Sequence, residues 1–380
     1  MISKSMSCKK KVQADCWGEL SRRPLLLRPA GKDYLWGGVR LREEYGKDLP
    51  YTPLAETWEC STHPDGPSVV AEVAGACEGD GAVVPGEGLQ GLGLDEVLKT
   101  YPEWLGSRHW GANEATTECS DGQGKAELPI LIKFIDAAKD LSVQVHPDDE
   151  YALVHENQLG KTEVWYVLDA EPGAKLVYGF AHDVTREQVL ESLRTGTLTN
   201  YLQQVPVHKN DVFFVKAGTV HGIGGGVLVA EIQENSNVTY RVYDYDRVDK
   251  NGQKRPLHVE KALEVMSLKK ADSPRQQIRL MRYQPGSASE ILCRCPYFQV
   301  DRVLVSSEYR FRVESTSFQV LLVLEGEMSV AANSVPEGDG PVSVVERNVI
   351  QARKGDCIFL PADCGEIQVR GKGQLLQVFG

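Results

Sequence analysis

The sequence has no long apolar segment, and no run approaches the roughly 18 apolar residues of a membrane helix. Its start, MISKSMSCKKKVQADCWGEL, contains basic residues but no apolar core of the kind found in secretory signals. Basic residues are in the minority, with 42 Lys and Arg against 53 Asp and Glu and a net charge of −11. Nucleic acids and anionic membranes select basic surfaces, so the sequence predicts neither partner. A few local cations can still form a pocket for an anionic small molecule.

A dense framework of cysteines is also lacking. The nine cysteines are an odd number spread through 380 residues, whereas secreted disulfide scaffolds are small, dense in cysteine and usually even in count. The distribution therefore favours a reducing, cytoplasmic location. Hydrophobic residues make up 42% of the chain, which is ordinary globular usage and allows a packed interior in two or three compact units.

Short apolar runs separated by turn residues dominate the chain from residue 128 onward. Three stretches interrupt or flank them with helical patterns: LDEVLKTYPEWLG, VTREQVLESLRTG and HVEKALEVMSLKK. Residues 25–70 indicate irregular strands and turns, and the Gly-rich stretches 75–91 and 111–125 indicate surface loops. The runs are typical of an antiparallel sandwich or barrel, and they are ILIKFIDA, LSVQVHP, TEVWYVLDA, AKLVYGF, DVFFVKAG, VLVAEIQE, FQVDRVLV, FQVLLVLEGEMSV, DCIFLPADC and QLLQVF.

One short pattern occurs in both β-rich regions. KNDVFFVKA in the first and KGDCIFLPA in the second share K-x-D-x-x-F-x-x-A, which indicates a duplicated β unit. We therefore predict a mainly β protein of two sandwich- or barrel-type units with a few helices. The predicted division is an N-terminal tail (1–24), a first β unit with helical insertions (25–275) and a second, C-terminal β unit (276–380).

Four residues have the spacing of a metal site. Gln144 and His146 lie two apart in the strand-like LSVQVHP, so both side chains point to one face. Glu163 lies in the next strand candidate, and His221 follows a third in AGTVHGIG. One amide, two imidazoles and one carboxylate suit a borderline divalent cation with room for water or substrate. A lone histidine is more often a surface or hydrogen-bonded residue, and we read the remaining six in that way: His63, His109, His155, His182, His208 and His258.

A polar wall follows the metal candidates directly. In an extended segment, residues of equal parity face one side, although a bend at ENSN would break the pattern. Arg241 provides a planar, permanently charged group suited to binding a phosphate or an enediolate. Lys161, which points to the same strand face as Glu163, provides a second cation. The alternative for Arg241 is a salt bridge to Asp244 or Asp246. The residues of equal parity are Glu231, Asn235, Asn237, Arg241 and Tyr243.

With QVHP, GKTE, GTVH and E-x-x-x-N-S-x-x-x-x-R in this order, the chain resembles the short, bacterial-type class I mannose-6-phosphate isomerases of the cupin superfamily. The similarity runs from about residue 25 to the C-terminus and is densest over 128–265. The resemblance implies two cupin-type barrels, a catalytic cupin unit with helical insertions (25–275) and a degenerate, structural C-terminal cupin-like unit (276–380). It implies that Zn²⁺ is held by Gln144, His146, Glu163 and His221. It also implies catalytic roles for Arg241 and Lys161 and a sugar pocket near Trp36 and Glu59, with Glu231, Asn237 and Tyr243 as further substrate-binding candidates.

One departure from the family concerns Asn237, where many members have Asp, so a carboxylate base is not expected at that position. The resemblance implies interconversion of mannose 6-phosphate and fructose 6-phosphate by proton transfer through an enediol, with a sugar phosphate as the small-molecule partner. The alternatives are a metal-dependent cupin oxygenase and a non-catalytic sugar-binding cupin. The sequence leaves open the proton-transfer base, the phosphate-binding cation, the metal loaded in the cell and the oligomeric state.

Overall fold

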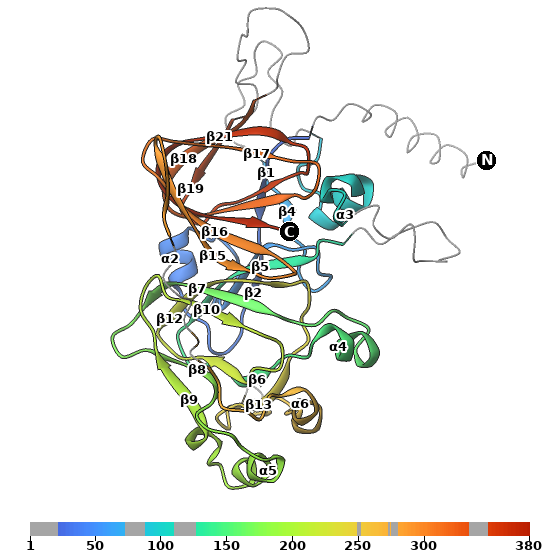
Figure 1. Ribbon diagram of the computed structural model, residues 1–380, viewed down its shortest axis with the longest axis vertical. Coiled ribbons are helices and arrows are strands. Elements are labelled where there is room, and N and C mark those ends of the chain that lie inside the picture. Colours follow the sequence, from blue (N-terminus) through green and yellow to red (C-terminus); the bar gives the residue numbers. More distant parts are fainter. Residues whose placement is uncertain are drawn as a thin grey trace, which may run out of the picture.

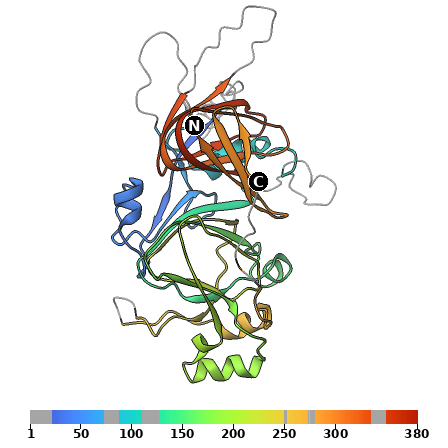
Figure 2. The same cartoon turned by 60° about the vertical axis from the view of Figure 1, so that its left-hand side comes forward.

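The computed structural model describes residues 22–72, 88–109, 127–248, 252–272, 274, 280–333 and 349–380. Most of the N-terminal tail, both Gly-rich stretches and the predicted boundary at 275 lie largely or wholly outside these residues. The described part is mainly β, as predicted, and forms two barrel-like units stacked along the long axis of the molecule (Figure 1). A second view, turned by 60°, shows the same two units one above the other (Figure 2).

The unit drawn mostly in green and yellow is built from two antiparallel sheets that face each other across the candidate site. The six-stranded sheet contains the long apolar runs, and the five-stranded sheet contains the shorter strands with the histidines. In sheet order, the first comprises β10 (Val212–Val215), β7 (Glu163–Ala170), β12 (Val227–Glu234), β5 (Ile130–Ala137), β3 (Glu56–Cys60) and β2 (Ala30–Lys32). The second comprises β13 (Tyr240–Tyr243), β6 (Val143–Val145), β11 (His221–Ile223), β8 (Lys175–Phe180) and β9 (Leu202–Pro206).

The other unit is one ten-stranded antiparallel sheet, drawn mostly in orange and red in Figure 1. Its main path is β14 (Arg282–Gln284), β15 (Ser287–Arg294), β16 (Gln299–Val305), β21 (Gly365–Phe379), β18 (Gln319–Asn333), β20 (Cys357–Leu360), β1 (Leu25–Arg28) and β4 (Val69–Val70). Two more strands join it, β17 (Glu308–Val313) on β21 and β19 (Val349–Arg353) on β18.

Strand pairing departs from the predicted domain division at the N-terminal end. β1 pairs with β20, with Leu25 opposite Phe359, and β4 pairs with the other side of β1. The first strand of the predicted catalytic unit therefore belongs to the C-terminal sheet. An apolar cluster also joins the two units. It contains Phe134 of β5 together with Leu376 of β21 and Phe318, which directly precedes β18.

The repeated K-x-D pattern has the same backbone geometry in both units. Its second residue has a positive φ in each copy, 72° at Asn210 and 98° at Gly355, which makes a tight turn before β10 or β20. The following aspartate, Asp211 or Asp356, accepts a hydrogen bond from the backbone amide three residues earlier, at 3.0 and 2.9 Å. The echo is thus a shared turn that leads into a buried strand.

The helices are few and short. The second predicted helix is α5 (Arg186–Arg194), which begins where the Thr185 side chain accepts from the Gln188 amide, and the third is α6 (Val259–Val265). The first is shorter than expected, because Pro102 turns its second half into a 3₁₀ helix after α3 (Leu94–Thr100). Two helices were not predicted, α2 (Arg40–Tyr45) and α4 (Asp149–His155). Within the described residues, no helix is long and apolar enough to span a bilayer.

Candidate metal centre and substrate cavity

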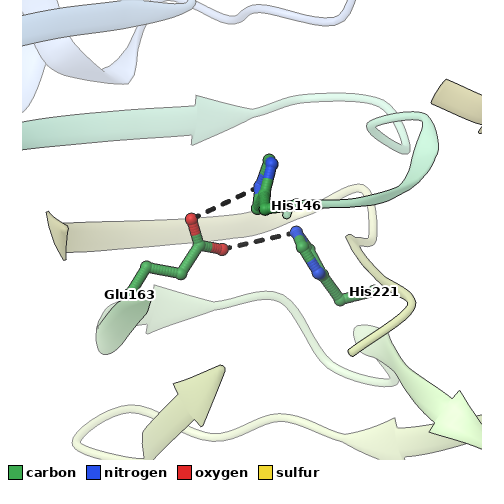
Figure 3. A group of neighbouring side chains, drawn as sticks. All are labelled: His146, Glu163 and His221. Carbon is green, nitrogen blue, oxygen red and sulfur yellow. Dashed lines mark ion pairs between the residues drawn. The ribbon is translucent and has the colours of Figure 1, made fainter. Parts of the chain in front are cut away.

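Three of the four predicted metal ligands converge on one point. Their ligand atoms all lie within 4.8 Å of one another, and the three side chains are almost completely buried. Glu163 begins β7 in the six-stranded sheet, and its two carboxylate oxygens face His146 Nε2 at 3.6 Å and His221 Nε2 at 3.4 Å (Figure 3). His221 begins β11, and His146 directly follows β6 in the opposite sheet. The two sheets therefore supply the ligands from both sides.

Both imidazoles present the nitrogen that a metal requires. His146 Nδ1 lies 2.8 Å from the carbonyl oxygen of Val238, and His221 Nδ1 lies 2.8 Å from that of Thr219. A carbonyl only accepts, so each Nδ1 carries a proton and donates it, and each Nε2 keeps its lone pair directed at Glu163. Burial lowers the pKa of His221 to about 4 and that of His146 well below the usual value, so both rings are neutral.

A positive charge already lies among these acceptors. Lys161 Nζ is 2.7 Å from Glu163 Oε2, 3.2 Å from His146 Nε2 and 3.7 Å from Glu231 Oε1. Burial raises the pKa of Glu163 to about 7, and the neighbouring Glu231 adds to this rise. Burial also opposes ionisation of Glu231, but Lys161 and Lys133 outweigh it and lower its pKa to about 2. The arrangement is suited to hold cationic charge.

Gln144 borders the three ligands from β6, which lies between β13 and β11 in its sheet. It pairs with His221 of β11 on one side and with Arg241 of β13 on the other. Its amide nitrogen faces His221 Nε2 at 3.4 Å, and its Oε1 lies 3.3 Å from the Ser142 hydroxyl. As a ligand, Gln144 would have to exchange the two ends of its amide, which are nearly indistinguishable in shape.

A cavity of about 260 Å³ opens beside this centre. It is polar, with cationic and anionic side chains on its walls and two tryptophans. Seven of the predicted site residues line it: Trp36, Gln144, Lys161, His221, Glu231, Asn237 and Arg241.

Arg241 makes no salt bridge with either aspartate that the sequence offered as an alternative. Asp244 is bound by Arg247 and Arg255, and Asp246 pairs with Lys254. Arg241 Nη1 donates to the Pro256 carbonyl at 3.0 Å, while its Nε is buried and without a hydrogen-bond partner. The guanidinium therefore has donor capacity left for an anionic ligand.

Two predicted substrate-binding residues lie outside the cavity lining. Glu59 is fully buried on the opposite face of β3, where it accepts from Lys47 Nζ and Thr57 Oγ1, both at 2.6 Å. Tyr243 stacks toward Tyr245, because the β13–β6 register shifts between residues 241 and 243 and breaks the expected alternation. We therefore correct both assignments. Asn235, which has the same parity, also lies outside the lining.

Asn237 faces the cavity through a loop rather than along a strand, because the chain bends between β12 and β13. Its Nδ2 donates to Asp65 Oδ2 at 2.9 Å, which fixes the orientation of the amide. Asp65 comes from the HPDG turn after β3, far away in the sequence. The neutral amide noted in the sequence is thus paired with a carboxylate at the cavity edge.

Several cavity residues were not predicted from the sequence. Lys133 lies opposite Glu231 in the β12–β5 pairing, with its Nζ 3.3 Å from Glu231 Oε1 and 3.8 Å from Glu56 Oε2. The lysine inside the apolar run ILIKFIDA could have been noticed in the sequence. A charge in a buried strand needs a partner of opposite charge, so such a lysine indicates a polar site. Arg255, which arrives from the segment after β13, had no such signal. The unpredicted lining residues include Tyr34, Glu56, Lys133, Ser142, Thr239 and Arg255.

Comparison with known proteins gives a consistent result. The model of "Phosphomannose isomerase type I, catalytic domain" matches residues 25–173. "Probable mannose-6-phosphate isomerase GmuF" of Bacillus subtilis is 36% identical over 92% of this chain and 96% of its own length. "Mannose-6-phosphate isomerase" of Streptococcus mutans is 34% identical over 89% of this chain and 92% of its own. The chain belongs to the type I mannose-6-phosphate isomerase family. The predicted isomerase and the family resemblance are thereby confirmed.

The solved structures agree with this fold. The crystal structure of the mannose 6-phosphate isomerase from Bacillus subtilis matches with a TM-score of 0.76 and 28% identity. The match covers 94% of this isomerase and 99% of that chain. The two-unit architecture described above is therefore shared along almost the entire length.

A buried carboxyl beside the cavity loop gives a prediction about stability. Glu234 is 2% exposed, and its Oε2 accepts from the Thr162 amide at 2.6 Å. Burial raises its pKa to about 8, with Asp149 contributing. Between about pH 4.5 and 8 the folded chain keeps this proton and the unfolded chain has lost it, so rising pH favours unfolding.

Glu234→Gln should therefore become more stable than the parent as the pH rises from 5 to 8. The expected gain is at most about 1.4 kcal/mol for each pH unit crossed, because glutamine carries no proton to lose. Thermal denaturation at pH 5, 6.5 and 8 measures it, with Glu260→Gln on the exposed face of α6 as the matched control. A difference in melting temperature that stays constant with pH would contradict the assignment.

Proposed function

We propose that this isomerase interconverts mannose 6-phosphate and fructose 6-phosphate with zinc as its metal and an enediol as the intermediate. The observation that carries the proposal is the convergence of two neutral imidazoles and one buried carboxylate beside a cavity lined by cations. Neutral Nε2 atoms, a carboxylate oxygen and an amide oxygen form a donor set that Zn²⁺ accepts. The relatives named as mannose-6-phosphate isomerases support the choice of substrate.

His146, Glu163 and His221 would hold the metal, with Gln144 as the fourth ligand after exchange of its amide ends. The hydrogen bonds from each Nδ1 to a backbone carbonyl fix the rings for this purpose. When bound, the metal supplies Lewis-acid polarisation of the sugar oxygens. The remaining chemistry belongs to side chains of the chain itself.

Lys161 is the group that we assign to proton transfer between C1 and C2. Its Nζ lies at the centre of the site, within 4 Å of His146, Glu163 and Glu231, and its side chain lines the cavity. An aldose–ketose exchange needs a group that takes and returns a proton on one face of the sugar. As the neutral amine, Nζ would take the proton from one carbon, become the ammonium and return the proton to the neighbouring carbon.

Arg241 is assigned to the anionic oxygens of the intermediate. In the β13–β6 pairing it lies directly opposite Gln144, which places its strand position next to the metal ligands. Its buried Nε has no hydrogen-bond partner among the residues that the structure describes. A preorganised guanidinium in a buried site stabilises developing negative charge without reorganisation. Lys161 and Arg241 therefore take different parts of the same reaction.

Arg255 is assigned to the phosphate. It lines the cavity, and Asp244 holds its guanidinium through Nε at 2.8 Å and Nη2 at 2.5 Å. Asp244 is only 6% exposed, so it fixes the guanidinium in place and leaves donors for a second anion. Burial and the nearby charge of Arg255 lower the pKa of Arg241, but an arginine remains protonated in proteins.

Arg255→Ala should raise KM for mannose 6-phosphate roughly three- to tenfold and change kcat less. The loss is modest because Asp244 already neutralises part of the charge. Steady-state kinetics and inhibition by inorganic phosphate measure the effect. Arg247→Ala is the matched control, because Arg247 also binds Asp244 but does not line the cavity. Equal effects of the two substitutions would argue against a direct phosphate contact.

A coupled assay tests the proposed function as a whole. The protein is incubated with mannose 6-phosphate, and fructose 6-phosphate is detected, first as purified, then after chelation, then with added Zn²⁺. We expect turnover that chelation abolishes and zinc restores. Glucose 6-phosphate is the control sugar and should not be converted at a comparable rate. No conversion by the zinc-loaded protein would refute the proposal.

A further inference from the structure

Asp65 holds a side chain of the cavity in one orientation. Asn237 lines the cavity, and its Nδ2 donates to Asp65 Oδ2 at 2.9 Å. An ionised carboxylate only accepts hydrogen bonds, so this contact distinguishes the two ends of the Asn237 amide and directs Nδ2 toward Asp65. No residue in the described part of the chain donates to the Asn237 Oδ1, so this oxygen is left for a ligand.

The segment that carries Asn237 is attached to the metal centre. The carbonyl oxygen of the next residue, Val238, accepts from His146 Nδ1 at 2.8 Å. Val238 and Tyr240 pack into an apolar cluster away from the cavity, while Asn237, of opposite parity, lines it. A molecule bound in the cavity beside the metal centre therefore lies close to the Asn237 amide.

The turn that carries Asp65 is fixed by several backbone contacts. The amide of His63 donates to Ser61 Oγ at 3.1 Å, and the amide of Asp65 donates to His63 Nδ1, also at 3.1 Å. The Gly66 amide closes the turn on the His63 carbonyl at 3.0 Å. Lys32 Nζ donates to the Asp65 carbonyl at 2.6 Å. These contacts hold the backbone of Asp65 and leave its carboxylate free to bind Asn237.

The Asp65 carboxylate is not engaged by a positive charge. Among the described residues, no lysine or arginine forms a salt bridge with it, since Lys32 binds the backbone carbonyl instead. His63 Nδ1 lies 3.6 Å from Asp65 Oδ2, but it accepts from the Asp65 amide and so has no proton to donate. Burial also lowers the pKa of His63, so the ring is neutral. The carboxylate therefore acts on Asn237.

This pair keeps a neutral acceptor in the cavity and a negative charge at its edge. The Asp65 side chain is 54% exposed, so water screens its charge. A carboxylate at position 237 would place a second negative charge beside Asp65 and close to an anionic substrate. A hydrogen bond to a carboxylate also polarises the Asn237 amide, which makes Oδ1 a stronger acceptor.

We propose that Asp65 is a positioning residue for substrate binding, which orients Asn237 so that its Oδ1 accepts a hydrogen bond from a hydroxyl group of the sugar phosphate. For the class of ligand, this inference rests on the proposed function. A hydroxyl group can donate to Oδ1, whereas a fully ionised phosphate only accepts hydrogen bonds. Asn237 thus contributes to recognition of the sugar rather than of its phosphate.

Sorbitol 6-phosphate is the probe for this contact, because it has the hydroxyl groups and phosphate of a hexose phosphate but no carbonyl group to isomerise. Calorimetry with the zinc-loaded protein gives its Kd. Asp65→Ala should raise Kd roughly three- to tenfold, with metal content and melting temperature close to those of the parent. Asp65→Asn should stay within about twofold of the parent, because an amide oxygen still accepts from Asn237.

Asp33→Ala is the matched control for the loss of one negative charge. Asp33 is exposed and directly precedes Tyr34 of the cavity lining, so this variant should leave the Kd unchanged.

A double variant tests whether Asp65 acts through Asn237. Asn237→Ala should raise Kd at least as much as Asp65→Ala, and combining the two substitutions should raise it no further. Additive losses, an unchanged Kd in Asp65→Ala, an equal loss in Asp65→Asn, or no binding of the probe by the parent would overturn the proposal. Failure of the proposed function is a different result, in which the parent binds sorbitol 6-phosphate but does not convert mannose 6-phosphate.

Discussion

Glu163→Gln is expected to abolish metal binding and to lower kcat roughly a thousandfold or more. The carboxylate is the only anionic group among the three converging ligands, and it faces both imidazoles through its two oxygens. Glutamine has nearly the same shape, so the cavity should remain intact while the charge that attracts a cation is lost. Metal content of the purified protein and steady-state turnover measure the two effects.

Glu234→Gln provides a matched control for this experiment. Glu234 is also almost completely buried, but its side chain binds a backbone amide and does not line the cavity. It should retain metal and near-normal turnover. A Glu163→Gln protein with full zinc occupancy and normal kcat would show that the three converging side chains are not the metal centre.

Arg241→Ala is expected to lower kcat by roughly 10²- to 10³-fold with metal content unchanged. The substitution removes a guanidinium whose strand neighbour is Gln144 and whose Nε has no hydrogen-bond partner in the described part of the chain. Among the described residues, it breaks one side-chain hydrogen bond, to the carbonyl of the exposed Pro256, so stability should change little. Steady-state kinetics together with metal analysis separates a loss of chemistry from a loss of the metal.

Arg241→Lys distinguishes charge from shape at this position. Lysine restores the charge but not the planar pair of donors, so it should recover only part of the lost kcat. Full recovery would mean that charge alone is sufficient, and near-normal turnover of Arg241→Ala would remove the residue from the mechanism. A large rise in KM with unchanged kcat would instead indicate that Arg241 binds the phosphate.

Local patterns in the sequence predicted the strands, and the convergence of His146 and Glu163, for a physical reason. Residues two apart on a strand share a face, and buried strands are visible as apolar runs, so QVHP and KTE indicated that these two side chains meet, and they lie 3.6 Å apart. The same rule failed where the backbone is irregular. The register shift in β13 turns Tyr243 away. Glu59, which only the family resemblance implied, lies outside the cavity lining, and Glu56 of the same strand lines the cavity instead.

Contacts across the fold were beyond any local pattern. Arg255 reaches the cavity only because its segment packs along β13, where the His258 amide donates to the Arg241 carbonyl. The pairing of Asn237 with Asp65 joins residues 172 positions apart. Such contacts depend on sheet topology, which periodicity does not specify. The division into two units also missed the place of β1, since a four-residue strand does not reveal its partner.

Because β1 inserts beside β20, the C-terminal barrel is not a self-sufficient piece of chain. Residues 25–28 lie between β20 and the edge strand β4, and a growing polypeptide releases them more than 300 positions before their partner in β20. Productive folding must therefore wait for nearly the last residues to be synthesised. A fragment that begins at residue 276 would lack β1 and leave the backbone groups of β20 unpaired on that side. A tag or fusion that disturbs β1 would therefore affect the C-terminal unit, although β1 lies near the N-terminus.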